Sequence, residues 1–166
     1  SFPTRRSSDL LSRQNIEDIP AKPGSTRFDD ALEAQQGAYI VKDCEGKPDI
    51  ILVANGSEVS TMMGATTTLE QDKGLKVRVV SAISEGLFRQ QPVDYQKNII
   101  PDNIPVLGLT AGLPVALQSL VGCKGKVIGM ESFGFSAPYK VLDQKLGYTP
   151  ENIVKQAEIY LQEYEQ

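Results

Sequence analysis

The sequence predicts an α/β fold with three layers (α/β/α), in which helices cover both faces of a five-stranded, mostly parallel mixed sheet. Segments typical of strands alternate with segments typical of helices from residue 38 onward, and this alternation favours parallel strands joined by helical crossovers. Residues 49–54 (DIILVA) form a nearly continuous apolar run, as expected for a strand that is buried on both faces of such a sheet.

The size and composition of the chain are those of one soluble globular domain. It has 166 residues, of which 40% are hydrophobic and 23% are charged, and this length is sufficient to bury a core. The formal net charge of −4 disfavours a nucleic-acid partner. No apolar run approaches the roughly 20 residues that span a bilayer, so we expect no membrane partner and a cytoplasmic location.

The segment before the first strand is predicted to be mostly irregular. Residues 16–36 contain two prolines and a glycine among scattered apolar residues, a composition typical of a linker, with one helical turn at residues 28–34. A short strand follows at residues 38–41. Because no crossover helix precedes this strand, we expect it to be the antiparallel edge of the sheet.

Turn and capping signals separate the next elements. After the apolar strand at residues 49–54, Asn55 and Gly56 favour a tight turn, and Ser57 is placed to cap a helix. Valines that alternate with charged residues indicate the next strand. The elements predicted here are a helix from Ser57 to residue 71, a strand at residues 75–81, and short helices at residues 85–90 and 93–99.

Two more strands follow, separated by a helix. Residues 104–109 form the third core strand, and Gly112 breaks the chain after it. The helix at residues 115–121 is stopped by Gly122. Residues 126–130 form the last strand of the predicted sheet.

Capping signals define two helices at the C-terminal end. Ser136 is placed to cap the first, with Pro138 early in its first turn, and Gly147 suits the left-handed residue that ends a helix. Thr149 is placed to cap the second helix, with Pro150 at its first position. The apolar face predicted for this last helix comprises Ile153, Val154, Ala157, Ile159, Tyr160 and Leu161.

The chain offers few candidates for catalysis. It contains no histidine, the commonest general acid–base and metal ligand in proteins. Its Asp, Glu and Cys residues lack metal-ligand spacing, so we assign no catalytic, cofactor-binding or metal-binding residue. Cys44 and Cys123 are far apart in sequence and form no redox motif, and we expect both to be reduced.

Two motifs allow a functional interpretation beside a structural one. Residues 55–58 connect a strand to a helix, where exposed backbone N–H groups can hold an anion, although a tight turn with a capped helix explains the same residues. Residues 132–136 contain two serines that suit a nucleophile, but no base accompanies them. Helix capping is therefore the preferred interpretation of Ser136.

Four segments resemble, in order, the C-terminal part of transketolases. They are LSRQN at residues 11–15, the strand and turn at residues 49–60, LKVRVVS at residues 75–81, and FGFSAPYKVLDQKLGYTPENIV at residues 133–154. The resemblance implies that residues 37–166 are a transketolase C-terminal domain with a three-layer fold and a five-stranded mixed sheet. Residues 11–36 would then be the end of the pyrimidine-binding domain and a linker.

The resemblance implies a parent enzyme several times longer than this chain. Transketolases transfer a two-carbon ketol unit between phosphorylated sugars in the pentose phosphate pathway, with thiamine diphosphate and Mg²⁺ or Ca²⁺ as cofactors, and they act as homodimers. In this family the cofactor-binding domains and the catalytic histidines lie upstream. We therefore expect the chain to be a fragment that is inactive alone and binds no cofactor.

One functional residue is carried over from the resemblance. In transketolases the arginine of the matching Ser-Arg-Gln segment binds the phosphate of the sugar substrate, which implies that Arg13 is a sugar-phosphate ligand. A guanidinium suits this role because it is planar, offers several donors and stays charged. Without the family match, a surface arginine is the simpler interpretation.

Two segments depart from the family pattern. Thr110 stands where an acidic residue is common before Ala-Gly, so no role of that acid is assigned here. Residues 1–10 (SFPTRRSSDL) match nothing in the pattern and resemble the translation of a common sequencing-library adapter. We expect them to be non-native and not to be part of the fold; a native, disordered Ser- and Arg-rich arm is the alternative.

Other identities stay open. The chain can be the corresponding domain of another thiamine-diphosphate enzyme, such as deoxyxylulose-phosphate synthase or a 2-oxoacid dehydrogenase β subunit. It can also be a freestanding, non-catalytic binding or assembly module. The Ser-Arg-Gln segment and residues 133–154 favour transketolase over these alternatives, and the genomic sequence upstream of Leu11 would discriminate between a fragment and a module.

Overall fold

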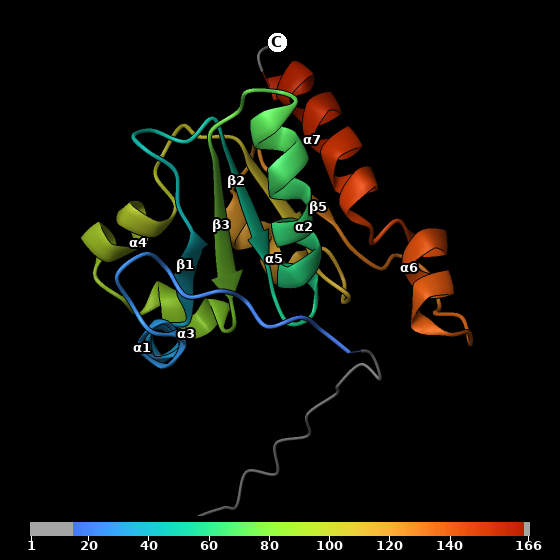
Figure 1. Cartoon of the computed structure of the whole chain (residues 1–166), viewed down its shortest axis with the longest axis horizontal. Coiled ribbons are helices and arrows are strands. Elements are labelled where there is room, and N and C mark those ends of the chain that lie inside the picture. The colour runs from blue at the N-terminus through green and yellow to red at the C-terminus, as the bar shows by residue number, and fades with distance from the viewer. Residues whose placement is uncertain (1–14, 165–166) are drawn as a thin grey trace, which may run out of the picture.

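The computed structural model describes residues 15–164, in which strands and helices alternate as the sequence predicts (Figure 1). Within this range, no helix combines the length and apolar character needed to cross a membrane. In chain order the elements are α1 (Arg27–Leu32), the 3₁₀ turn η1 (Glu33–Gln36), β1 (Ala38–Lys42), β2 (Ile50–Ala54), α2 (Glu58–Gln71), β3 (Val77–Ala82), α3 (Glu85–Arg89), α4 (Val93–Ile99), β4 (Val106–Leu109), α5 (Val115–Val121), β5 (Lys126–Ile128), α6 (Tyr139–Leu146) and α7 (Pro150–Tyr164).

The five strands form one mixed sheet in the order β1-β3-β2-β4-β5. β1 pairs antiparallel with β3, whereas the pairs β2–β3, β2–β4 and β4–β5 are parallel. The predicted antiparallel edge strand is therefore confirmed. The chain leaves β2 for β3 on one side and later returns to β4 on the other, so β2 and β4 flank the point where the strand order reverses.

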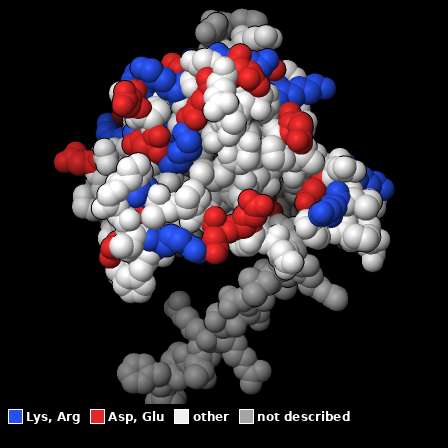
Figure 2. All heavy atoms as spheres, viewed as in Figure 1, with Lys and Arg blue, Asp and Glu red and all other residues white. Residues whose placement is uncertain are grey.

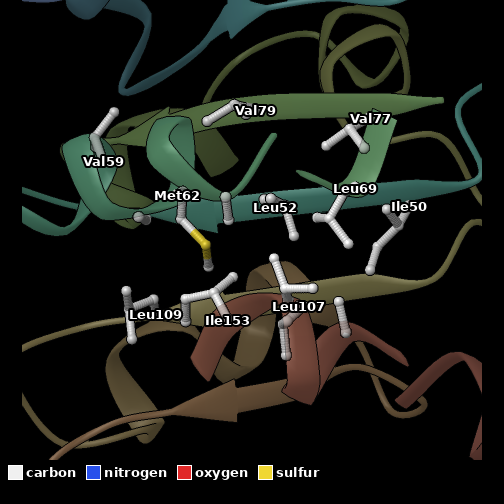
Figure 3. Packing of buried hydrophobic residues seen from close by; sticks show 14 of the residues in the cluster. Ile50, Leu52, Val59, Met62, Leu69, Val77, Val79, Leu107, Leu109 and Ile153 are labelled. Carbon is white, nitrogen blue, oxygen red and sulfur yellow. The ribbon is translucent and has the colours of Figure 1, made fainter. Parts of the chain in front are cut away.

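The central strand β2 has no exposed residue and contributes to two separate cores. Ile50 and Leu52 pack with α2 and α7 on one face of the sheet (Figure 3). Ile51 and Val53 pack with residues of α3, α4 and α5 on the other face. Alternate side chains of a strand point to opposite faces, so this apolar run fills both cores and produces the predicted three layers.

Helices α2 and α7 lie side by side over one face of the sheet (Figure 1). A glycine in α2 permits the close approach, because a Cβ built on Gly64 would lie 2.8 Å from Cγ of Pro150 at the start of α7. From α7, Ile153, Ala157 and Tyr160 are buried against the sheet and α2. This confirms the central part of the apolar face predicted for the terminal helix.

The capping predictions for the last two helices have different outcomes. Gly147 ends α6 in the left-handed conformation (φ 79°), and Thr149 Oγ1 accepts a hydrogen bond (3.3 Å) from a backbone N–H in the first turn of α7. Both predictions are confirmed. Ser136, however, does not cap α6, because this helix begins at Tyr139 and its N-cap is Pro138. The proline holds an extended backbone (φ −55°, ψ 142°) and disfavours helix at the residue before it.

A buried arginine joins the β1–β2 turn to helix α4. Arg78 Nε and Nη2 donate to the two carboxylate oxygens of Asp43 (2.8 and 3.1 Å), and Nη1 donates to the carbonyls of Asn98 (2.7 Å) and Ile99 (3.2 Å). A cation is favourable beside the free carbonyls at a helix C-terminus. The strand pattern places Arg78 correctly on β3 but does not reveal that its side chain is buried.

Tyr160 of α7 connects two backbone segments at the edge of the core. Its hydroxyl accepts a hydrogen bond from the N–H of Val106 (3.0 Å) and donates one to the carbonyl of Lys124 (3.0 Å). The side chain is only 3% exposed, and burial raises the pKa of its phenol. One hydroxyl therefore satisfies the backbone at the beginning of β4 and just before β5.

We predict that Tyr160→Phe lowers the free energy of unfolding of the chain by about 1–3 kcal/mol, because it leaves a buried N–H and a carbonyl without their partner. Urea denaturation measures this change. The control is Tyr139→Phe, which removes a hydroxyl from a side chain that is 36% exposed and should change stability by less than about 0.5 kcal/mol. Equal stability of the two variants would contradict the assigned role of Tyr160.

Candidate functional site

The carboxyl ends of β2 and β4 flank the point where the strand order reverses. In open α/β sheets, ligands bind where the strand order reverses, outside the carboxyl ends of the strands. Residues 55–58 follow β2 at this end of the strands, and the loop that begins at Thr110 follows β4. The sequence singled out both segments, and the structure brings them to the same edge of the sheet.

The turn after β2 is occupied by a carboxylate. Gly56 adopts a positive φ of 60°, and Glu58 begins α2 with only 8% of its surface exposed. Ser57 is the N-cap residue, but its Oγ donates to Glu58 Oε1 (2.8 Å) instead of accepting from the helix. The predicted cap position is therefore right, whereas the predicted capping bond is wrong.

This carboxylate disfavours the anion-binding interpretation of residues 55–58. A Cβ built on Gly56 would lie 3.7 Å from Glu58 Oε2, so the carboxylate lies directly beside the turn. The positive end of the α2 dipole stabilises its negative charge. A phosphate placed there would meet a like charge at short range, and the arrangement fits a tight turn better than an anion site.

Thr110 stabilises the turn that follows β4. The side chain is buried, and its Oγ1 accepts a hydrogen bond from the N–H of Gly112 (3.1 Å). Its own N–H donates to the carbonyl of Ile128 (3.0 Å). Threonine and aspartate can both accept a backbone N–H two residues ahead. The hydroxyl therefore stabilises the turn after β4, and it has no reacting partner.

Tyr148, in the α6–α7 connection, reaches the residue that follows β4. Its hydroxyl donates to the carbonyl of Thr110 (3.0 Å). Burial raises the pKa of this phenol, and the nearby negative charge of Glu58 raises it further, so the proton stays on the oxygen at neutral pH. The sequence did not single out Tyr148, because only the fold brings it to Thr110.

Among the described residues, the carboxyl ends of β2 and β4 are thus packed and carry no catalytic arrangement of side chains. Tyr148 and Thr110 use their polar groups on each other and on the backbone. Within residues 15–164, no group of three or more His, Cys, Asp or Glu residues is arranged to hold a metal ion. Ser132 and Ser136 lie on an exposed segment, where Ser132 Oγ contacts only the next carbonyl (3.4 Å), and this gives no support to a nucleophile.

A broad cleft lies at the opposite end of the strands, near the amino ends of β4 and β5. It has a volume of about 910 Å³ and is lined by residues of α4, α5 and the loops before these strands. Arg89 and Lys97 on its wall form exposed ion pairs with Glu85 (2.6 Å) and Asp102 (2.8 Å). Lys124, which also lines the cleft, has its Nζ 5.3 Å from the centre of the Tyr164 ring. We assign no ligand to the cleft.

The two cysteines and Arg13 are the remaining residues that the sequence singled out. Cys44 and Cys123 are both free thiols, as expected, and burial raises the pKa of Cys44. Arg13 lies outside the described residues 15–164, so its role stays a prediction. Figure 2 shows Lys and Arg interspersed with Asp and Glu on the face that it displays, without the single basic stripe typical of a nucleic-acid site.

Comparison with known proteins identifies the family. The model of the transketolase-like TK C-terminal domain matches residues 37–149. The transketolase of Aquifex aeolicus is 37% identical over 145 residues, which cover 87% of this chain and 20% of that protein. Transketolase 2 of Escherichia coli is 38% identical over 149 residues, which cover 89% of this chain and 21% of that protein. The chain thus spans about a fifth of the length of these relatives.

Solved structures agree with the sequence matches. Transketolase from Leishmania mexicana superposes with a TM-score of 0.77 at 32% identity, covering 93% of this chain and 21% of that one. Transketolase from Pichia stipitis in complex with sedoheptulose 7-phosphate gives a TM-score of 0.74 at 29% identity, covering 92% and 21%. Because the family model matches more than half of the sequence, this chain belongs to the transketolase C-terminal domain family.

Proposed function

We propose that this chain is the C-terminal part of a transketolase, a transferase that moves a two-carbon ketol unit between phosphorylated sugars in the pentose phosphate pathway. The observation that carries the proposal is 37–38% identity to two transketolases over 87–89% of the chain. The fold alone would not support it, because this architecture hosts many chemistries. The Pichia stipitis complex with sedoheptulose 7-phosphate supports sugar phosphates as substrates.

The proposal includes the organisation of the parent protein. Residues 11–36 would end the pyrimidine-binding domain and lead into the C-terminal domain at residues 37–166. The parent would be a cytoplasmic homodimer without a nucleic-acid or membrane partner. Family membership favours this organisation over a freestanding module.

The residues described here do not fit thiamine diphosphate or its divalent metal. The turn at the carboxyl end of β2 presents the Glu58 carboxylate, which would repel a diphosphate. No metal-binding group of acidic, Cys or His side chains lies within residues 15–164. We therefore assign cofactor binding to the domains that precede this chain in a transketolase, and derive no cofactor step from these residues.

Arg13 is the residue through which this chain would act on the substrate. Its guanidinium can donate two parallel hydrogen bonds to a phosphate, with a charge that does not titrate at neutral pH. Such binding orients the sugar without touching the bonds that react. Loss of this arginine should therefore weaken the binding of phosphorylated sugars more than that of sugars without phosphate.

We predict that Arg13→Ala in the full-length enzyme raises KM for xylulose 5-phosphate by about 10–100-fold, as expected when charge-assisted hydrogen bonds worth about 1.5–3 kcal/mol are lost. The KM of Arg13→Lys should lie between the values of Arg13→Ala and the wild type, because lysine keeps the charge but not the planar pair of donors. Steady-state kinetics with phosphorylated and unphosphorylated donors provide the measurement.

The matched control for Arg13 is Arg27→Ala. Arg27 is 59% exposed in its side chain and forms a surface ion pair with Asp18 (2.7 Å), so the same loss of charge should leave KM unchanged. An unchanged KM in Arg13→Ala, or an equal effect on donors with and without phosphate, would remove Arg13 from the substrate site.

We also predict that the purified 166-residue chain neither turns over xylulose 5-phosphate nor binds thiamine diphosphate. The physical reason is that the described residues offer no site for the diphosphate or metal. A coupled assay and isothermal calorimetry, with the full-length enzyme as the positive control, test both statements. Turnover by the isolated chain would refute the assignment of the active centre to the preceding domains.

A further inference from the structure

The turn that joins β2 to α2 contains an asparagine followed by a glycine. Asn55-Gly56 is the one Asn-Gly pair in the sequence, whereas each of the other four asparagines precedes an isoleucine. The backbone nitrogen of the following residue can attack the side-chain amide of an asparagine. Glycine has no Cβ to hinder this attack, while the branched side chain of isoleucine crowds it. The sequence therefore singles out Asn55 as the most reactive asparagine of the chain.

The structure leaves both reacting groups accessible. Gly56 is exposed and Asn55 is half-buried, and the two residues lie after the end of β2 and before the N-cap of α2, outside any helix or strand. Within residues 15–164, no hydrogen bond holds the side-chain amide of Asn55 or the N–H of Gly56, and the amide is not buried. Neither group has a partner that would keep it from reacting.

The fold itself requires the glycine of this pair. Gly56 has a φ of 60°, a backbone conformation that glycine adopts at no steric cost and other residues adopt with strain. The residue that permits the turn is thus also the residue that leaves its nitrogen unhindered.

We propose that Asn55 is a site of spontaneous modification, where the side-chain amide is converted to a carboxylate. Asparagine is among the side chains that degrade in proteins with time and heat. The nitrogen of Gly56 attacks Cγ of Asn55, a new C–N bond forms, and the side-chain nitrogen leaves as ammonia together with the proton of the Gly56 N–H. The product of this step is a succinimide ring.

Water then opens the ring at one of its two carbonyl carbons. Attack at the side-chain carbonyl gives aspartate, and attack at the main-chain carbonyl gives isoaspartate, in which the backbone runs through the side-chain carbons. The whole reaction consumes one water and releases one ammonia, and it needs no oxidant, metal or cofactor. Because only the chain and water take part, its outcome does not depend on ketol transfer by the parent enzyme.

Both products place a new negative charge beside the start of α2. Glu58, three residues further on, is a carboxylate with only 8% of its surface exposed, so the two like charges repel. Isoaspartate also lengthens the backbone by one methylene directly after Ala54, a fully buried residue of β2. Because α2 packs its buried side chains against the sheet, this extra length disturbs its fit, and we expect the modified chain to be less stable.

The test is incubation of the 166-residue chain at neutral pH, followed by trypsin and mass spectrometry. The peptide of residues 43–73 carries Asn55, and the peptide of residues 98–124 carries Asn103 as an internal control. Asn103 is exposed and also lies in a turn, but it precedes Ile104. We expect replacement of NH₂ by OH about tenfold faster at Asn55 than at Asn103, because glycine leaves the attacking nitrogen open.

A second measurement identifies the ring as the intermediate. An isoaspartyl methyltransferase, which methylates isoaspartate and not aspartate, should label the peptide of residues 43–73 after incubation. Equal rates at Asn55 and Asn103 would overturn the proposal. So would a product that is aspartate alone, since direct hydrolysis of the amide gives no isoaspartate.

The matched variant is Asn55→Gln, which keeps an uncharged amide but must close a larger and less favourable ring. Its peptide should stay unmodified, and its melting temperature should be the same before and after incubation, whereas that of the wild type falls as isoaspartate accumulates. Asn55→Asp, measured when freshly purified, carries the new charge on a backbone of normal length. It should therefore be more stable than the isoaspartate form of the wild type.

Discussion

The fold depends on one strand that cannot tolerate water on either face. All five residues of β2 are aliphatic and fully buried, so helices must cover both sides of the sheet. Ile50 and Leu52 require the α2–α7 layer, and Ile51 and Val53 require the layer of α3, α4 and α5. The parallel order around β2, with a long crossover on each side, is the arrangement that places these helices on both faces.

Buried polar side chains then form hydrogen bonds to the turns and loops around the hydrophobic cores. Arg78 links the β1–β2 turn to the end of α4, Tyr160 links the start of β4 to the loop before β5, and Tyr148 links α6–α7 to the loop after β4. Of these bonds, only that of Tyr148 lies where open α/β sheets bind ligands, outside the carboxyl ends of β2 and β4. The carboxyl ends of β2 and β4 therefore serve stability in this domain.

Family membership and the geometry of the described residues both favour a structural role for this domain. The described residues form a domain in which the hydroxyls of Tyr148 and Tyr160 and the guanidinium of Arg78 are hydrogen-bonded within the chain. A domain of this kind suits a structural part of a larger enzyme, in which it positions a neighbouring segment and the active centre is built elsewhere. Arg13, just upstream of the described residues, is the residue of this chain that we propose to contact the substrate.

The sequence by itself determined the strands, the helices, the antiparallel edge and the Gly147 and Thr149 signals, because these depend on periodicity and on neighbours within a few residues. It also carried the family resemblance. It wrongly predicted that Ser136 caps α6, and it did not show that Thr110 accepts a hydrogen bond from the N–H of Gly112. Only the tertiary structure decided the burial of Arg78 and the contacts of Tyr148 and Tyr160. The partners of these side chains lie about 20–55 residues away along the chain, and local pattern carries no information about which distant backbone atoms the packed layers bring within hydrogen-bond distance.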